Sequence, residues 1–359
     1  MGELYEQICS WDNLRLAHQN AARGKRGKHA AAAFEYNLAD NLLALQSELI
    51  SQTYQPGPYH SFYVHDPKHR LISAAPFRDR VVHHALCKVT APILERGFIY
   101  DSYANRVGKG THRALPKGAQ AFARRFRYVL QCDVEQFFPA IDHRMMRRLL
   151  ARKIHDGPTL WLIDQILASG VGILAEQYTL RYFAGDTLLD ALRPRGLPIG
   201  NLTSQFWANC YLTPFDHFVQ RELRCPGYVR YVDDGLLFGD DLRSLWAWRD
   251  GIVERLAQFR LTIHPGAQPR PTSEGVPFLG FVVYPDHRRL KRRKVVAYRR
   301  KLDTLVADWR ARAATREMVE ASWQGWVNHA RYGDTWGLRC RLANSIPPFR
   351  GGVPCPRTP

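Results

Sequence analysis

Two adjacent acids interrupt an apolar stretch of the chain, in the run Tyr231-Val232-Asp233-Asp234-Gly235. Asp-Gly between two apolar segments is typical of the turn of a β-hairpin. The flanking residues, Tyr228-Val229 and Leu236-Leu237-Phe238, are apolar enough for a hairpin in the middle of a sheet. A surface turn whose acids only face water is the simplest interpretation. In a buried hairpin, however, adjacent carboxylates repel each other unless a cation lies between them, and Mg²⁺ prefers such oxygen ligands.

A third acid, Asp133, directly follows the mostly apolar segment 128–132, which predicts a short strand. A carboxylate at the end of a core strand is where α/β architectures place ligand groups. If this strand lies beside the hairpin, Asp133 and Asp233 can bridge two metal ions. One ion would lower the pKa of an attacking hydroxyl, and the other would neutralise a leaving pyrophosphate. Phosphoryl transfer needs little more from the protein than this positioning.

The charge balance favours a polyanionic partner. The chain of 359 residues has 51 Lys and Arg against 33 Asp and Glu, a net charge of +18, which indicates nucleic acid rather than membrane. No stretch reaches 18 apolar residues and the N-terminus shows no secretory signal, so we expect a cytoplasmic protein without a membrane partner. The seven cysteines form no CxxC pair, which disfavours a zinc ribbon and suits reduced, buried thiols.

Apolar spacing predicts two helices in the first fifty residues, joined by a basic loop at 24–29. Strands are expected at 62–64 and 70–72 around a turn at Asp66-Pro67, followed by a helix that Asp79 caps.

Further along the chain, Asp142 is expected to cap a helix that runs to Ile154, and residues 159–169 form the next helix. Residues 171–195 look like an irregular insertion, and Asn201 is expected to cap the helix after it. Residues 278–284 read as a strand, and residues 287–312, with eleven Lys or Arg and two acids, as a basic helix of at least twenty residues.

Four motifs in this order resemble those of reverse transcriptases. They are Asp133-x-x-x-Phe137-Phe138, then Gly196-Leu197-Pro198-Ile199-Gly200-Asn201-Leu202-Thr203-Ser204-Gln205, then Tyr231-Val232-Asp233-Asp234, then Phe278-Leu279-Gly280-Phe281. Upstream, Arg70-Leu71-Ile72 and Ser102-Tyr103-Ala104-Asn105-Arg106 resemble the fingers motifs of that family.

The resemblance implies an α+β fold shaped as a right-hand polymerase. Residues 1–127 would form N-terminal helices and fingers. Residues 128–285 would form the palm, with an antiparallel sheet and the insertion 171–195. Residues 286–345 would form a helical thumb, and 346–359 a flexible tail.

Within the family, Ile199-Gly200-Asn201 and the Ser204-Gln205 ending resemble the diversity-generating retroelement group, because retroviral and group II intron enzymes usually carry Gln-Gly and end in Ser-Pro. The resemblance implies an RNA-directed DNA polymerase that copies an RNA template into cDNA with errors at template adenines. It also implies dNTP substrates, an RNA–DNA duplex and a small basic accessory protein. Antiphage-defence reverse transcriptases share much of the pattern. A catalytically idle RNA-binding scaffold and a nucleotide cyclase are further alternatives.

The resemblance assigns roles to individual residues. Asp133, Asp233 and the carbonyl of Val134 would hold two Mg²⁺ ions, for which Mn²⁺ can substitute, while Asp234 supports them and orients the primer end. Phe138 would act as a steric gate against a ribose 2′-OH. The nucleotide-binding candidates are Arg70, Lys68, Arg106, Ile199, Gly200 and Gln205. The nucleic-acid-binding candidates are Lys109, Arg288, Arg289, Arg292, Arg293 and Lys294.

Each assignment has a plainer structural interpretation. The basic residues can be solvated surface charges. Phe137 and Phe138 can both belong to the core, and we expect one of them to do so, because successive side chains in an extended segment point to opposite faces. Ile199 can be an ordinary packing residue, although an Ile where the family often has Gln loses polar contacts that reject wrong base pairs. Gly235 departs from the family pattern, which usually has an apolar residue after the two acids.

Overall fold

The computed structural model describes residues 2–64 and 69–345. Four N-terminal helices stand where two were predicted: α1 (Glu3–Cys9), α2 (Trp11–Ala22), α3 (His29–Tyr36) and α4 (Leu38–Ile50). Each predicted helix is divided in two. Ser10 leaves helical geometry and accepts a hydrogen bond from the Asn13 amide as the N-cap of α2, and Asn37 separates α3 from α4.

The strands β1 (His60–Val64) and β2 (Arg70–Ala74) pair antiparallel, as predicted. The turn at Asp66-Pro67 and the candidate Lys68 lie outside the described residues. The helix α5 (Phe77–Glu95) begins two residues before Asp79, so the prediction that Asp79 caps it is wrong. The buried Asp79 carboxylate instead accepts hydrogen bonds from the Tyr54 hydroxyl and the Gly57 amide, both at 2.8 Å.

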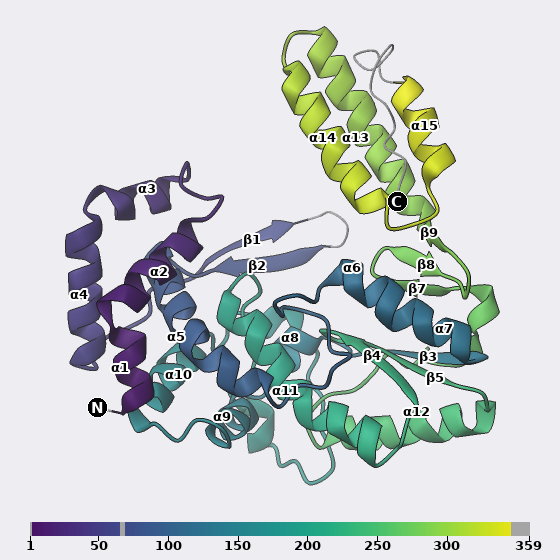
Figure 1. Cartoon of the computed structure of the whole chain (residues 1–359). Helices are drawn as coiled ribbons and strands as arrows, with labels where there is room; N and C mark the ends of the chain where they lie inside the picture. The colour runs from purple at the N-terminus through teal and green to yellow at the C-terminus, as the bar shows by residue number, and fades with distance from the viewer. Residues whose placement is uncertain (1, 65–68, 346–359) are drawn as a thin grey trace.

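A four-stranded antiparallel sheet lies at the centre of the molecule, in the order β4-β5-β3-β6. Its strands are β3 (Tyr128–Asp133), β4 (Gly227–Tyr231), β5 (Asp234–Gly239) and β6 (Pro269–Pro271). Because side chains alternate along a strand, Leu130 and Cys132 face one core while Val129 faces the other. The helices α11 (Leu202–Arg221) and α12 (Leu242–Ala257) cover the first face (Figure 1).

The other face carries α6 (Thr111–Arg113), the π-helical η1 (Ala114–Gln120) and α7 (Ala121–Arg125). Gly118 permits this close packing, because a Cβ there would lie only 3.1 Å from the Val229 Cγ1 atom.

The segment between β3 and α11 contains α8 (Phe137–Ala140), α9 (His143–Ala151) and α10 (Gly157–Ser169). Asp142 caps α9 as predicted, although the helix ends three residues before Ile154. Residues 171–195 are irregular, as predicted, apart from the short turns η2 (Ala175–Gln177) and η3 (Leu189–Leu192). Asn201 precedes α11 without capping it, because its amide is bonded to Ser73, Ala75 and Pro198 instead.

A second antiparallel sheet follows η4 (Thr272–Glu274) and consists of β7 (Val276–Phe278), β8 (Phe281–Val283) and β9 (Arg288–Leu290). Residues 278–284 are therefore not one strand. Leu279 and Gly280, at φ +48° and +91°, turn the chain between two strands. The basic helix α13 (Arg292–Arg310) is shorter than predicted, since 288–290 belong to β9.

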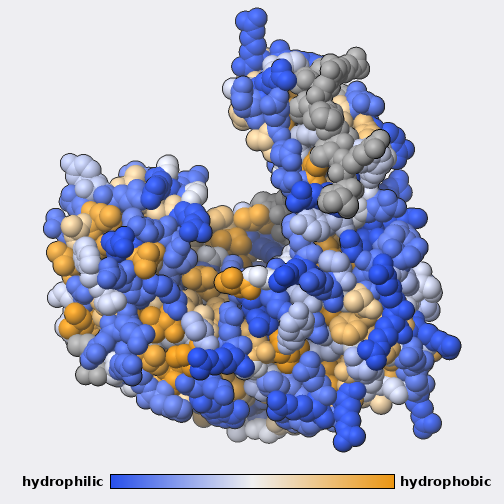
Figure 2. Space-filling view, in the orientation of Figure 1, coloured by the Kyte–Doolittle hydropathy of each residue, from blue (hydrophilic) through white to orange (hydrophobic). Residues whose placement is uncertain are grey.

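The helices α13, α14 (Arg316–Ala330) and α15 (Trp336–Ser345) form a bundle that rises above the second sheet, away from α1–α5 (Figure 1). Figure 2 shows the molecule hollowed between this bundle and the N-terminal helices, with hydrophilic residues covering most of the visible bundle surface. Along the described parts of the chain, no helix is both long and apolar enough to cross a membrane. The predicted division into fingers, palm, thumb and tail remains a prediction, and residues 346–359 lie outside the described residues.

Candidate active site

Three aspartates meet at one end of the central sheet. Asp133 is the last residue of β3 and lies directly opposite Asp234 in β5. The amide of Val134 donates to the carbonyl of Asp233 at 3.2 Å, which ties the end of β3 to the β4–β5 turn. Directly opposed residues of an antiparallel pair point to the same face. Alternation along the strands places Asp133 and Asp234 on the face of Val129 and Leu236, the face that carries residues 114–125 and the second sheet.

The turn of the hairpin differs from the prediction. Tyr231 pairs with Asp234, so Val232 and Asp233 form the two-residue turn, and Asp234-Gly235 belongs to β5. Val232 has φ +57°, a left-handed conformation that a β-branched residue rarely adopts. The prediction of a turn at Asp234-Gly235 is wrong, and the turn lies two residues earlier. Contacts from outside the hairpin fix the register of its strands.

The carboxylate of Asp234 is partly buried and lies near two other carboxylates. Burial and the neighbouring charges of Asp133 and Asp233 raise the pKa of Asp234 to about 7, although a hydrogen bond from Gln131 and the charge of Lys291 oppose this shift. Gln131 donates from Nε2 to the Asp234 carboxylate at 2.9 Å and accepts from the Arg270 guanidinium at 3.1 Å.

The residues at the site fit a divalent cation. Within residues 2–64 and 69–345, no three His, Cys, Asp or Glu side chains form a ready-made metal-binding cluster. The side chains nearest one another at this end of the sheet are nevertheless the carboxylates of Asp133, Asp233 and Asp234, which are oxygen donors. Mg²⁺ favours such a set and keeps positions for water and substrate phosphates. A cation among them would relieve the repulsion that raises the pKa of Asp234.

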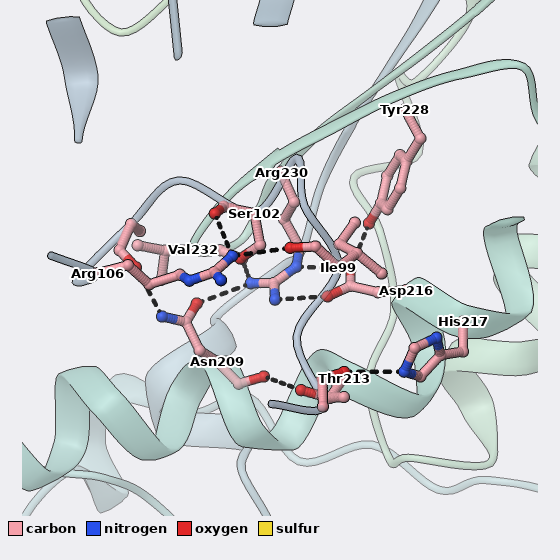
Figure 3. A network of polar contacts seen from close by, with 12 residues as sticks. Ile99, Ser102, Arg106, Asn209, Thr213, Asp216, His217, Tyr228, Arg230 and Val232 are labelled. Atoms are coloured by element: carbon pink, nitrogen blue, oxygen red, sulfur yellow. Dashed lines mark hydrogen bonds and ion pairs between the residues drawn. The ribbon is translucent and has the colours of Figure 1, made fainter. Parts of the chain in front are cut away.

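A buried ion pair supports the turn from the opposite face of the sheet (Figure 3). Arg230 donates from Nε and Nη2 to both carboxylate oxygens of Asp216, at 2.7 and 2.6 Å. Its Nη1 donates to Asn209 at 3.0 Å and to the carbonyl of Val232 at 2.8 Å. The hydroxyl of Tyr228 also donates to Asp216, at 2.8 Å. Arg230 therefore fastens the strained residue of the turn to α11.

Sequence analysis missed Arg230 and Asp216. Both are buried, Arg230 in a strand and Asp216 in a helix, and a charged residue of each sign in neighbouring buried elements is the signal that could have pointed to them.

Several predicted nucleotide-binding residues lie between β2 and the start of α11. The amide of Ser73 donates to the carbonyl of Ile199 at 2.8 Å, and a Cβ on Gly200, at φ +118°, would lie 3.0 Å from Ile72. Arg70 is exposed on β2, and Ile199 is half-buried. Gln205 is exposed on α11 and its carbonyl accepts from Asn105.

Phe137 is only 2% exposed, so one of the two adjacent rings belongs to the core as expected, while Phe138 is half-buried. The physical reason differs from the prediction, because both residues lie in the short helix α8 and not in an extended segment.

Arg106 and Lys109 are engaged within the protein. The Nη1 atom of Arg106 donates to the carbonyls of Ile99 and Ser102 at 2.8 and 2.9 Å (Figure 3). Lys109 donates to the carbonyl of Tyr100 at 2.7 Å and lies over the ring of that residue. The contacts of Arg106 and Lys109 stabilise the loop that contains these two residues.

The predicted duplex-binding residues divide into two groups. Arg288 donates from Nε to the carbonyl of Tyr332 at 2.7 Å and contacts Gln120, so it joins the helical bundle to the central part of the chain. Arg289, Arg292 and Arg293 are exposed, and Lys294 is half-buried. Trp323 and Trp326 are buried in the bundle, whereas Trp336 is 40% exposed.

A family model described as reverse transcriptase (RNA-dependent DNA polymerase) matches residues 64–283, a range that includes all three aspartates. The chain is similar to protein YkfC of Escherichia coli (strain K12), with 25% identity over 221 residues, 60% of this chain and 51% of that protein. It is also similar to the group II intron-encoded protein LtrA of Lactococcus lactis subsp. cremoris, with 28% identity over 227 residues, 60% of this chain and 35% of that protein.

A third relative is the nuclear intron maturase 2, mitochondrial, of Arabidopsis thaliana, with 25% identity over 173 residues, 44% of this chain and 23% of that protein. The matches thus span about half or less of the length of these relatives. Since the family model covers more than half of the chain, the chain belongs to the reverse transcriptase (RNA-dependent DNA polymerase) family.

Proposed function

We propose that the protein is an RNA-directed DNA polymerase that copies an RNA template into cDNA. The observation that carries this proposal is the pairing of Asp133 and Asp234 on one face of the central sheet with Asp233 in the adjoining turn, where burial and the two acidic neighbours raise the pKa of Asp234. Membership in the reverse transcriptase family supports the same reaction. The hollow between the N-terminal helices and the bundle, which carries exposed arginines, suits an RNA–DNA duplex (Figure 2).

The roles of the residues follow from their places. Asp133, Asp233 and the carbonyl of Val134 would hold two Mg²⁺ ions, which supply charge neutralisation and activation of the primer 3′-hydroxyl. Asp234, which accepts a hydrogen bond from Gln131, would support these ions and orient the primer end. Phe138 would exclude a 2′-OH, and exposed Arg70 would bind the triphosphate of a dNTP. Arg289, Arg292, Arg293 and Lys294 would contact duplex phosphates.

We further propose that the enzyme serves a diversity-generating retroelement and copies template adenines with errors. Ile199 supports this role, because its carbonyl is fixed to β2 while its side chain offers no hydrogen bond to a nascent base pair. A small basic accessory protein would be its partner, bridged through RNA because both are positively charged.

Primer extension on a defined RNA template, with Mg²⁺, all four dNTPs and sequencing of every product, tests both proposals. The variant Asp233→Asn should abolish extension, while Asp250→Asn, at an exposed position on α12, should leave it unchanged. Errors concentrated opposite template adenines would support the retroelement role. A flat, low error profile would keep the polymerase function and favour a defence enzyme or another role. No product, even with the native RNA and the neighbouring protein, would indicate an idle RNA-binding scaffold.

A further inference from the structure

The insertion 171–195, called here the strap, contacts the residues that follow Asp133. Thr179 and Arg181 belong to the strap, and they meet Gln136 and Glu135. The amide of Thr179 donates to the Gln136 Oε1 atom at 2.9 Å, and Gln136 Nε2 donates back to the Thr179 hydroxyl at 3.2 Å. One position away, the Arg181 guanidinium pairs with the Glu135 carboxylate at 2.6 Å. The strap thus contacts two neighbouring residues of the loop that follows Asp133, namely Glu135 and Gln136.

These contacts stabilise Gln136, whose backbone is strained. It has φ +46° and ψ +42°, the left-handed conformation, which costs a residue other than glycine about 1–2 kcal/mol. It directly precedes α8 without a capping bond from its side chain to that helix. Strained residues persist where their surroundings determine the conformation, and the two bonds to Thr179 are such surroundings.

The backbone on the other side of this loop is held by the central part of the chain. The amide of Glu135 donates to the carbonyl of Thr262 at 2.8 Å, and the amide of His264 donates to the carbonyl of Asp133 at 3.0 Å. The loop from Asp133 to Gln136 therefore lies between a fixed backbone pairing and the side-chain contacts of the strap.

The strap is itself anchored firmly. The fully buried carboxylate of Asp186 pairs with Arg193, at 3.4 Å, and with Arg260. Arg193 also pairs with Asp142, at 3.1 Å, at the start of α9. Just beyond the strap, the amide of Leu197 donates to the carbonyl of Phe138 at 3.0 Å. The backbone around Phe138 is therefore held at two points, at Gln136 and at the carbonyl of Phe138 itself.

We propose that the strap sets the nucleotide-binding geometry of the active site. Thr179 and Arg181 are positioning residues that hold Gln136 and Glu135, and through them the carbonyl of Val134 and the ring of Phe138. This inference rests on the proposed polymerase function, since Phe138 would be the residue that separates dNTPs from rNTPs. A strap that only adds stability would leave this selectivity unchanged when its contacts are removed.

The test compares two controls in the full-length protein with the double variant Thr179→Val/Arg181→Met. This variant removes the bond to the Thr179 hydroxyl and the Arg181–Glu135 ion pair, and it leaves only the bond from the Thr179 amide to Gln136. Thr179→Ser keeps the hydroxyl. Arg147→Met removes an ion pair of the same length, Arg147–Asp164 at 2.6 Å, which joins α9 to α10 away from the loop. The kcat and KM for a dNTP and for the matching rNTP are measured in primer extension. A shift of reacting groups by an ångström can cost about 100-fold in rate, so we expect the preference for dNTP to fall by at least about tenfold in the double variant alone.

Hydrogen exchange of peptides covering residues 133–138 gives an answer that does not depend on activity. Faster exchange in the double variant than in Arg147→Met is the expected result. Unchanged exchange, or an unchanged dNTP preference despite lower stability, would overturn the inference while leaving the polymerase function intact. A wild-type protein that extends no primer would instead contradict the proposed function, and the exchange measurement would still decide whether the strap holds the loop.

Discussion

Removal of the charge of Asp216 should destabilise the protein far more than the loss of an ordinary ion pair. The side chains of Arg230 and Asp216 are 1% and 0% exposed, so water cannot replace the carboxylate. An unpaired buried charge costs about 3–5 kcal/mol, whereas a surface pair such as Arg147–Asp164 contributes about 0–1 kcal/mol. We therefore expect Asp216→Asn to lower the free energy of unfolding by about 3 kcal/mol, since the amide keeps part of the hydrogen bonding.

Equilibrium urea unfolding of the wild type, Asp216→Asn, Arg230→Met and the double variant Asp216→Leu/Arg230→Met measures this cost. The double variant should recover most of the stability, because it leaves no buried charge behind. Tyr228→Phe removes only one hydrogen bond to Asp216 and should cost about 1 kcal/mol. A loss below about 1 kcal/mol in Asp216→Asn, equal to that of Arg147→Met, would refute the reasoning.

The same variants should affect catalysis through the turn. Without Arg230 the carbonyl of Val232 loses its 2.8 Å hydrogen bond, and the left-handed conformation that places Asp233 is no longer enforced. At a temperature where Arg230→Met remains folded, we expect kcat to fall while the affinity for the template–primer duplex is unchanged. A proportional loss of both would show that the pair acts on overall stability alone.

Three further predictions concern other parts of the chain. Burial lowers the pKa of His83 to about 3, so below pH 6.5 the unfolded chain binds a proton at this residue that the folded chain does not bind. The free energy of unfolding should therefore decrease as the pH falls from about 6.5 toward 3, by up to about 1.4 kcal/mol per pH unit. Urea unfolding at several pH values should show this slope in the wild type relative to His83→Leu, and parallel profiles would contradict it. Ile199→Gln should raise copying fidelity opposite template adenines in product sequencing, and an unchanged error spectrum would count against the role of Ile199. Arg292→Gln and Arg293→Gln should each reduce the slope of log K against log salt for duplex binding by about 1 in fluorescence anisotropy, and an unchanged slope would exclude phosphate contacts by these residues.

Local patterns in the sequence predicted the strands that carry the aspartates. The apolar run before Asp133 and the apolar residues on either side of the Asp pair lie in β3, β4 and β5 of the structure. Local signals failed where a distant partner competed. Asp79 bonds to Tyr54 and Gly57 in place of capping α5, and Asn201 bonds to Ser73 and Ala75 in place of capping α11.

The partners of these supporting residues could not be read from the sequence, because each pair joins two elements that meet only in the folded chain. Arg230 meets Asp216 across a helix–sheet contact, and Gln136 meets Thr179 across 43 residues. Neither pair leaves a periodic pattern, and the irregular composition of 171–195 gives no hint that its Thr179 and Arg181 contact the loop after Asp133.

The strain at Val232 has a consequence for how the chain folds. A residue in a sparsely populated backbone conformation costs about 1–3 kcal/mol, which the short β4–β5 hairpin has little local stability to offset. The compensating bonds of Arg230 require Asp216 and Asn209, and therefore a docked α11. We expect the hairpin to be absent from the folding transition state even though its strands are neighbours in sequence, with φ-values near zero for substitutions at its turn. Because α11 precedes the hairpin in the chain, a nascent polypeptide would already contain the helix to which the β4–β5 turn is bonded.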